Sequence, residues 1–127
     1  PSSDNLENAA RHYSETITKT LGAPPLFDLT FLGLGDDAHT ASLFPNTGAV
    51  FDEGLTTTCQ PTTAKHERLT LSAEALSKSR TVVFLVSGEG KRKALSETRA
   101  SKGQFDTYPA RAIKAKENLY WLTDIEL

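Results

Sequence analysis

Apolar residues recur every three or four positions over the first part of the chain. This spacing predicts an amphipathic helix that begins at Asp4, where Glu7 completes a capping pair, and ends at Gly22. The apolar side of the expected helix consists of Leu6, Ala9, Ala10, Tyr13, Ile17 and Leu21. Gly22 to Pro25 then form a turn into the next element, because Gly and Pro both interrupt helices.

Short apolar runs predict strands in the rest of the chain. We expect these strands at 26–32, 68–71, 81–86 and 119–123. The run 81–86 is continuous and rich in Val, which is typical of a strand buried on both faces. Between the second and third strands, 73–77 is expected to form a helical turn.

Two further helices are expected directly after strands. Asp36 or Asp37 caps a short helix over 38–44, and the glycine turn 87–90 leads into another helix. One side of the second helix carries Lys91, Ala94, Leu95 and Thr98. Because helices separate the strands, the pattern predicts an α/β fold with a parallel, Rossmann-like sheet. The aperiodic, polar segment 46–65 is expected to be a long surface loop.

Composition narrows the classes of protein that fit. The 127 residues suit a single α/β domain over 1–127. The 14 Lys and Arg residues are dispersed and nearly balanced by 16 Asp and Glu residues, which does not favour a nucleic-acid or membrane partner. No apolar run approaches the roughly 20 residues that span a bilayer. Cys59 is the single cysteine, which fits a reducing compartment, so we expect a cytoplasmic location.

The strongest chemical signal follows the first expected strand, at Gly33-Leu34-Gly35-Asp36-Asp37-Ala38-His39. Ligands of parallel α/β sheets bind beyond the carboxyl ends of strands, where helix amides favour anions. In the first turn of a helix, His39 is kept neutral and available as a base. Asp37 can hold its imidazole in one tautomer. The alternative for His39 is a structural histidine, and the alternative for Asp37 is a simple N-cap.

Other kinds of site fit this segment less well. The third glycine of a dinucleotide-binding fingerprint is absent, since Ala38 stands in its place. Ser42 lacks the glycine-flanked elbow that exposes a nucleophilic serine. Asp36, Asp37 and His39 lie too close together for an i, i+4 pair of metal ligands. His12 and His66 are expected to be surface residues.

Two cations are candidates for binding an anion. Lys91 follows a strand, a glycine turn and a helix start, which repeats the arrangement around Gly33 and Gly35. Backbone amides and one ammonium at such a place can hold a phosphate group. Arg68, at the start of an expected strand, is the second candidate. The alternative for Lys91 is a solvated lysine beside Arg92 and Lys93.

The segment Phe27–Gly35, together with His39-Thr40-Ala41-Ser42-Leu43-Phe44-Pro45, resembles the signature of 6-phosphogluconolactonases. The likeness extends to Arg68–Leu71, to Gly88-x-x-Lys91 and to the later segments Tyr108-Pro109-Ala110 and Leu119–Asp124. These enzymes are about twice as long as this chain, which resembles their carboxyl-terminal half. The resemblance implies a larger sugar-phosphate isomerase/deaminase-like fold, with the amino-terminal half absent or present as a separate partner chain.

The resemblance also implies an activity and a set of site residues. It implies hydrolysis of 6-phosphogluconolactone without a metal or organic cofactor. Water attacks the lactone carbonyl after His39 removes its proton, while Asp37 orients the ring. Backbone amides from Gly35 to Ala38 are expected to stabilise the oxyanion. The implied substrate-binding residues are Gly33, Gly35, Asp36, Arg68 and Lys91.

The chain departs from the family pattern at Asp37-Ala38-His39, where the family has Asp-Gly-His. If this position needs a positive φ, a Cβ costs on the order of 1 kcal/mol, whereas a first helical residue tolerates alanine. The related glucosamine-6-phosphate deaminases carry Asn-Glu-Pro where this chain has Leu43-Phe44-Pro45. This difference favours lactone hydrolysis over deaminase-like isomerisation. A non-catalytic fragment or assembly partner, and a sugar-phosphate-binding regulator, are the other hypotheses.

Overall fold

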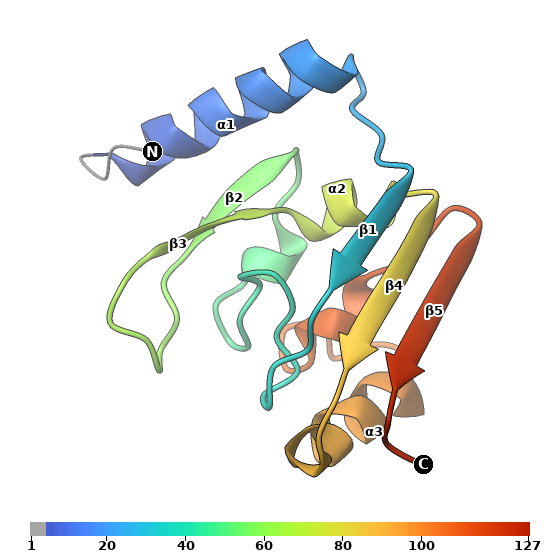
Figure 1. The fold of residues 1–127 in the computed structure, drawn as a ribbon. Helices are drawn as coiled ribbons and strands as arrows, with labels where there is room; N and C mark the ends of the chain where they lie inside the picture. The colour runs from blue at the N-terminus through green and yellow to red at the C-terminus, as the bar shows by residue number, and fades with distance from the viewer. Residues whose placement is uncertain (1–4) are drawn as a thin grey trace.

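The computed structural model describes residues 5–127 and begins with the expected amphipathic helix, α1 (Leu6–Leu21), shown in blue in Figure 1. The predicted cap at Asp4 lies outside the described residues. Asn5 caps the helix instead, because its side chain accepts a hydrogen bond from the Asn8 amide at 3.2 Å. The predicted stop at Gly22 is confirmed: its φ is 92° and its amide donates to the Thr18 carbonyl oxygen. No helix in the described part of the chain is long and apolar enough to cross a bilayer.

Three strands form the predicted parallel sheet. They are β1 (Leu29–Leu32), β4 (Thr81–Val86) and β5 (Asn118–Thr123), in the order β1-β4-β5. Their carboxyl ends therefore lie along one edge, at the arrowheads in Figure 1. The first strand is shorter than the expected 26–32, because strand pairing begins only at Leu29, opposite Thr81.

A separate antiparallel hairpin corrects two sequence-based expectations. The segment 46–65 is not a featureless loop, since it contains the 3-10 turn η1 (Ala49–Phe51) and strand β2 (Thr56–Cys59). Strand β3 (Arg68–Leu71) forms as predicted, but it pairs with β2 and not with the parallel sheet. Helix α1 packs on this hairpin, where the Thr56 hydroxyl donates to the Ala10 carbonyl oxygen at 2.8 Å.

The core lies against one face of the parallel sheet. Val82 and Phe84 on β4 are fully buried there, and Phe84 stacks on Trp121 of β5 with 4.2 Å between ring centroids. Helices α2 (Ala73–Ser77) and α3 (Arg92–Ala100) and the turn η3 (Pro109–Ala112) cover this face. The predicted buried side of α3 is confirmed at its three non-lysine positions, Ala94, Leu95 and Thr98.

The opposite face of the sheet is apolar and exposed. Alternate residues of the paired strands point there, and their exposed fractions lie between 49% and 59% for Leu29, Phe31, Leu85, Tyr120 and Leu122. The expectation that 81–86 is buried on both faces is therefore wrong at Leu85, because no described segment of the chain covers this side.

The predicted helix over 38–44 does not form. These residues make successive turns, with left-handed φ values of 67° at Ala38 and 50° at Ala41. The Leu43 amide donates to the Thr40 carbonyl oxygen at 3.0 Å, which closes a four-residue β-turn, while the Leu43 side chain is fully buried. Tertiary anchoring of this segment outweighs its local helical preference. His39 consequently does not lie in the first turn of a helix.

Candidate functional site

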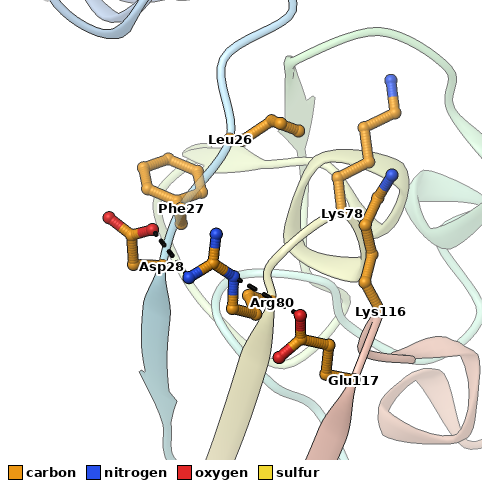
Figure 2. Close-up of a pocket in the computed structure, with 7 residues that line it drawn as sticks. All are labelled: Leu26, Phe27, Asp28, Lys78, Arg80, Lys116 and Glu117. Atoms are coloured by element: carbon orange, nitrogen blue, oxygen red, sulfur yellow. Dashed lines mark ion pairs between the residues drawn. The ribbon is translucent and has the colours of Figure 1, made fainter.

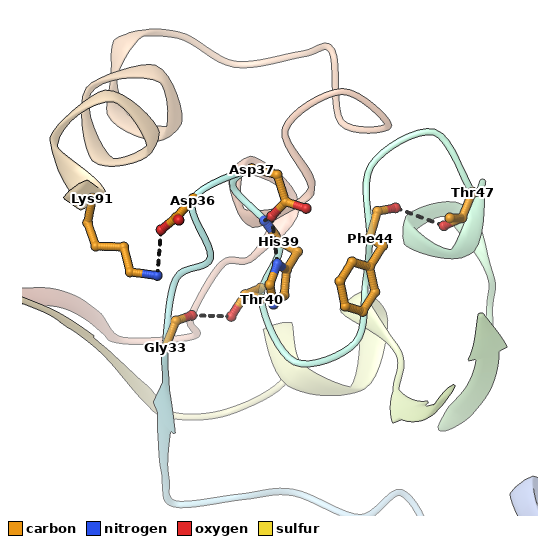
Figure 3. A network of polar contacts seen from close by, with 8 residues as sticks. All are labelled: Gly33, Asp36, Asp37, His39, Thr40, Phe44, Thr47 and Lys91. Atoms are coloured by element: carbon orange, nitrogen blue, oxygen red, sulfur yellow. Dashed lines mark hydrogen bonds and ion pairs between the residues drawn. The ribbon is translucent and has the colours of Figure 1, made fainter. Parts of the chain in front are cut away.

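The candidate site lies where the carboxyl ends of the parallel strands meet. The segment 33–45, called the site loop below, follows β1, and the turn Ser87–Lys91 follows β4. The Lys91 Nζ atom lies 2.9 Å from an Asp36 carboxylate oxygen and so joins the two segments (Figure 3). The Gly88 amide donates at 3.0 Å to the carboxylate of Asp124, which follows β5. Residues after all three strands are thus linked along one edge.

Buried hydrogen bonds fix the shape of the site loop. The hydroxyl of Thr40, which is 1% exposed, donates to the Gly33 carbonyl oxygen at 2.7 Å (Figure 3). The Ser42 amide donates to the Thr70 hydroxyl on β3 at 3.1 Å. This contact involves the Ser42 backbone and not its hydroxyl. Sequence reasoning gave no role to Thr40, because that role depends on the turn itself.

Asp37 and His39 form a close pair on this loop. The imidazole Nδ1 lies 2.6 Å from Asp37 Oδ1, and the His39 backbone amide donates to the same oxygen at 3.0 Å (Figure 3). An ionised carboxylate only accepts hydrogen bonds, so in the neutral imidazole Nδ1 carries the proton and Nε2 holds the free lone pair. The imidazole is about one-third exposed. The pairing predicted from sequence is therefore present in the structure, although it rests on a turn and not on a helix.

The pKa of Asp37 lies below its ordinary value of 3.8. Partial burial is the largest influence and raises this pKa. The hydrogen bonds from the backbone amide and the imidazole of His39, with the electrostatic attraction of His39, together outweigh that burial. The folded protein therefore favours the Asp37 carboxylate over the neutral acid.

This lowered pKa predicts an acid-dependent loss of stability. The contribution of the Asp37 carboxylate is complete above pH 3.8 and disappears as the pH falls through the lower pKa of the folded state. We expect the stability difference between the wild type and Asp37→Asn to be largest above pH 3.8 and to shrink as the pH falls through the lower pKa of the folded state. Urea unfolding at several pH values measures the difference. A difference that stays constant or grows on acidification would contradict the assignment.

Ala38 occupies a backbone conformation that glycine adopts more easily. Its φ is 67°, so the position corresponds to the first of the two alternatives considered above. The side chain is only 1% exposed and belongs to the core cluster. The methyl group is therefore strained by its backbone but favourably buried, and the two effects oppose each other.

Ala38→Gly is accordingly expected to change the free energy of unfolding by less than about 1 kcal/mol. Glycine removes the backbone strain of an alanine with a positive φ, which stabilises the fold. It also removes a buried methyl group and gives the unfolded chain more freedom, and both effects destabilise the fold. Ala94→Gly is the matched control, because Ala94 is 3% exposed but lies inside α3. Its cost should be about 2 kcal/mol, from helix propensity and the lost methyl. Urea unfolding compares the two. Equal losses would contradict strain at Ala38.

The two cations predicted to bind an anion are placed differently. Lys91 is half-buried and lies at the carboxyl-terminal edge of the sheet beside Asp36, whose carboxylate is 79% exposed. Arg68 lies on the hairpin, and within residues 5–127 its guanidinium makes one hydrogen bond, to the His66 carbonyl oxygen at 3.1 Å. Strand β3 nevertheless contacts the site loop through Thr70. The structure thus joins Lys91 to the site loop by a direct contact and Arg68 only through its strand.

The expected oxyanion donors need a correction. Of the amides from Gly35 to Ala38, that of Gly35 donates to the His39 carbonyl oxygen at 2.8 Å, and that of Ala38 to the Gly35 carbonyl oxygen at 3.0 Å. Both are used by the turn, because the loop closes on itself without forming a helix end. The Asp37 amide interacts with its own carboxylate, which leaves the Asp36 amide as a candidate donor in this segment.

A surface pocket of about 210 Å³ lies at the opposite end of the sheet, near the start of β4 (Figure 2). Its central cation, Arg80, lies 3.9 Å from an Asp28 oxygen and 3.7 Å from a Glu117 oxygen. These carboxylates balance its charge, and no histidine lines the pocket. The chemistry predicted from sequence therefore lies at the other edge, around His39.

Comparisons with known proteins agree with the architecture. The family described as glucosamine-6-phosphate isomerases/6-phosphogluconolactonase matches residues 1–121. A 6-phosphogluconolactonase from Synechocystis is 45% identical over 102 residues, which are 79% of this chain and 41% of that protein. The crystal structure of 6-phosphogluconolactonase from Thermotoga maritima has a TM-score of 0.81 at 32% identity. The match covers 95% of this chain and 52% of the Thermotoga chain.

A monomeric glucosamine-6-phosphate deaminase shares the fold, with a TM-score of 0.76 at 19% identity, covering 97% of this chain and 54% of that one. At this identity the likeness shows a shared fold alone. In each of these comparisons the match extends over only about half of the relative. The chain therefore spans about half the length of the relatives that it matches.

Proposed function

Because the chain belongs to the glucosamine-6-phosphate isomerase/6-phosphogluconolactonase family, we propose that it is the carboxyl-terminal half of a cytoplasmic 6-phosphogluconolactonase. The observation that carries this proposal is the Asp37–His39 pair at the carboxyl edge of the sheet, with the Lys91 ammonium on the same edge. A base with a free Nε2 on the same edge of the sheet as a cation suits a substrate that has both a lactone carbonyl and a phosphate.

The geometry supports a reaction in two proton transfers. Nε2 of His39 takes a proton from water as the water oxygen bonds to the lactone carbonyl carbon. The Asp37 carboxylate stabilises the imidazolium that results. When the tetrahedral intermediate collapses, the bond from the carbonyl carbon to the ring oxygen breaks, and Nε2 returns its proton to that oxygen. The products are a carboxylic acid and a hydroxyl group, and His39 is neutral again.

Lys91 is assigned to the substrate phosphate. In the absence of substrate its ammonium is paired with the exposed carboxylate of Asp36. A phosphate group carries more charge than one carboxylate and is a stronger acceptor, so it displaces Asp36 from Lys91. Asp36, predicted to be a substrate-binding residue, then acts indirectly, by holding Lys91 at the strand edge. Gly33, Gly35 and Arg68 remain part of the proposed substrate site.

The same site supports lactone hydrolysis better than deaminase-like isomerisation. At the position where the deaminases carry a glutamate, this chain has Phe44, and its ring is stacked on His39. A phenyl ring cannot transfer a proton to open a sugar ring. A carboxylate at this position is therefore replaced by an apolar contact, which leaves His39 and Asp37 as the acid–base pair.

The test compares 6-phosphogluconolactone with the corresponding unphosphorylated lactone, using the complete protein. Lys91→Ala should raise KM for the phosphorylated lactone about tenfold or more, because a charge-assisted contact contributes about 1.5–3 kcal/mol. KM for the unphosphorylated lactone should not change. Lys93→Ala, an exposed lysine two positions later, is the matched control. Equal effects of Lys91→Ala on both substrates would contradict the phosphate assignment, and absence of lactonase activity would contradict the function.

A second proposal concerns assembly, and the exposed apolar sheet face favours it. Parallel sheets are covered on both faces in folded proteins, yet Phe31, Leu85 and Leu122 on this face are about half exposed. Strands β1 and β5 also present unpaired edges. The relatives contain about as much polypeptide again as this chain. We infer that the amino-terminal half, joined to this chain or separate from it, covers this face.

Co-expression tests the assembly proposal. The chain should form a one-to-one complex with the part of the Synechocystis lactonase that it does not match, and Leu85→Lys with Leu122→Lys should abolish the complex. Phe51→Lys is the control, because Phe51 is 61% exposed and lies outside this face. Native mass spectrometry reads the stoichiometry. A lone monomer, or a dimer of this chain that persists with the added half, would contradict the proposal.

A further inference from the structure

Phe44 lies directly against the imidazole of His39. The two rings are stacked, with 4.3 Å between centroids and 21° between planes (Figure 3). The Phe44 side chain is half-buried and packs on the core, and its carbonyl oxygen accepts a hydrogen bond from the Thr47 hydroxyl at 2.8 Å. The preceding residue, Leu43, is fully buried. Phe44 is therefore a fixed surface against which the imidazole rests.

Gly35 restricts the same imidazole from the other end of the turn. A Cβ at Gly35 would lie 2.1 Å from Nδ1 and 2.2 Å from Cε1 of His39, which no real contact allows. The His39 ring therefore occupies space that any side chain at position 35 would fill. The Gly35 amide also donates to the His39 carbonyl oxygen at 2.8 Å, so backbone and ring are held together.

These contacts define which edge of the imidazole is available. Nδ1 is bonded to Asp37, one ring face is covered by Phe44, and Gly35 leaves no room behind the Nδ1–Cε1 bond. Nε2 makes no hydrogen bond to any of residues 5–127. The χ2 torsion of a histidine is broad and roughly two-fold, so the ring needs such neighbours to keep one orientation.

We propose that Phe44 is a positioning residue, whose stacked ring keeps the imidazole of His39 on Asp37 so that Nε2 faces the substrate. The catalytic consequence rests on the proposed lactonase function, whereas the positioning itself does not. A flat ring is needed, because stacked aromatic pairs have a preferred geometry that an aliphatic side chain of similar volume cannot reproduce. Phe44→Leu therefore keeps an apolar side chain at this position but releases the imidazole.

Nitrogen NMR of the imidazole tests the positioning without any activity. In the wild type at mildly alkaline pH, we expect one protonated-type signal for Nδ1 and one unprotonated-type signal for Nε2. Phe44→Leu should move both signals toward each other as the two tautomers and ring orientations mix. Phe44→Tyr, which keeps the ring, should restore the wild-type signals, and Phe51→Leu is the control at an exposed phenylalanine. Unchanged signals in folded Phe44→Leu would overturn the proposal.

Steady-state kinetics on the complete protein give the second readout. Phe44→Leu should lower kcat about tenfold, as expected for loss of a stacked aromatic pair, with KM within about twofold of the wild type. Phe44→Tyr should recover most of kcat. If Phe44→Leu does not fold, a Phe44→Tyr spectrum that differs from the wild type would still overturn the proposal. An altered NMR signature with no lactonase activity in any variant would refute the function and leave the positioning intact, so the two failures are distinguishable.

Discussion

His39→Ala is expected to lower kcat for 6-phosphogluconolactone at least about a hundredfold, because a positioned general acid–base typically contributes 10²–10⁴-fold. KM should change little, since the phosphate contact belongs to Lys91. The loss should not arise from unfolding, because the imidazole is about one-third exposed and its removal opens no deep cavity. Initial rates, corrected for spontaneous ring opening, measure the effect in the complete protein.

His12→Ala is the matched control for this prediction. His12 is exposed on α1, which packs on the β2–β3 hairpin. Its replacement should leave kcat and KM unchanged. A wild-type rate in His39→Ala would remove His39 from the mechanism, and an equal loss in both variants would indicate a general effect on the fold.

Gly35→Ala is expected to be the next most damaging change, with kcat about a hundredfold lower, because displacing a catalytic group by about 1 Å can cost that much. The added Cβ would meet Nδ1 of His39 at 2.1 Å and Asp37 Oδ1 at 2.9 Å. The imidazole must therefore leave its place on Asp37. Steady-state kinetics measure kcat, and thermal unfolding verifies that the variant is folded.

Gly90→Ala provides the comparison for Gly35→Ala. A Cβ at Gly90 would have no atom within 4 Å, and its backbone does not have a positive φ. The same substitution should therefore leave kcat within about twofold of the wild type, as for most surface changes. Activity retained in Gly35→Ala would mean that His39 acts from another position than the one described here.

Local sequence patterns predicted the elements whose stability is mainly local or strongly apolar. Helix α1 has its apolar side and its glycine stop in the sequence, and β4 is a continuous apolar run. Strand β2 was missed because Thr56–Cys59 is polar and gains its order only by pairing with β3. The exposure of Leu85 was equally hidden, because an uncovered sheet face leaves no mark on the strand sequence itself.

The site loop shows where local preference fails. Residues 38–44 have the composition of a helix, but Thr40 bonds back to Gly33 and Ser42 bonds to Thr70, and these long-range contacts fix turns instead. The Asp37–His39 contact could be predicted because the residues are two positions apart. The stacking of Phe44 on His39 could not, since it depends on the left-handed turns at Ala38 and Ala41.

We propose that His39, oriented by Asp37, activates water against a sugar-phosphate lactone. The most direct measurement is the rate of acid release from 6-phosphogluconolactone at constant pH, with the complete protein and with buffer alone. We expect release well above spontaneous ring opening, and a return to near the spontaneous rate in His39→Ala. Acid release that is no faster with the folded wild-type protein than in buffer would contradict it.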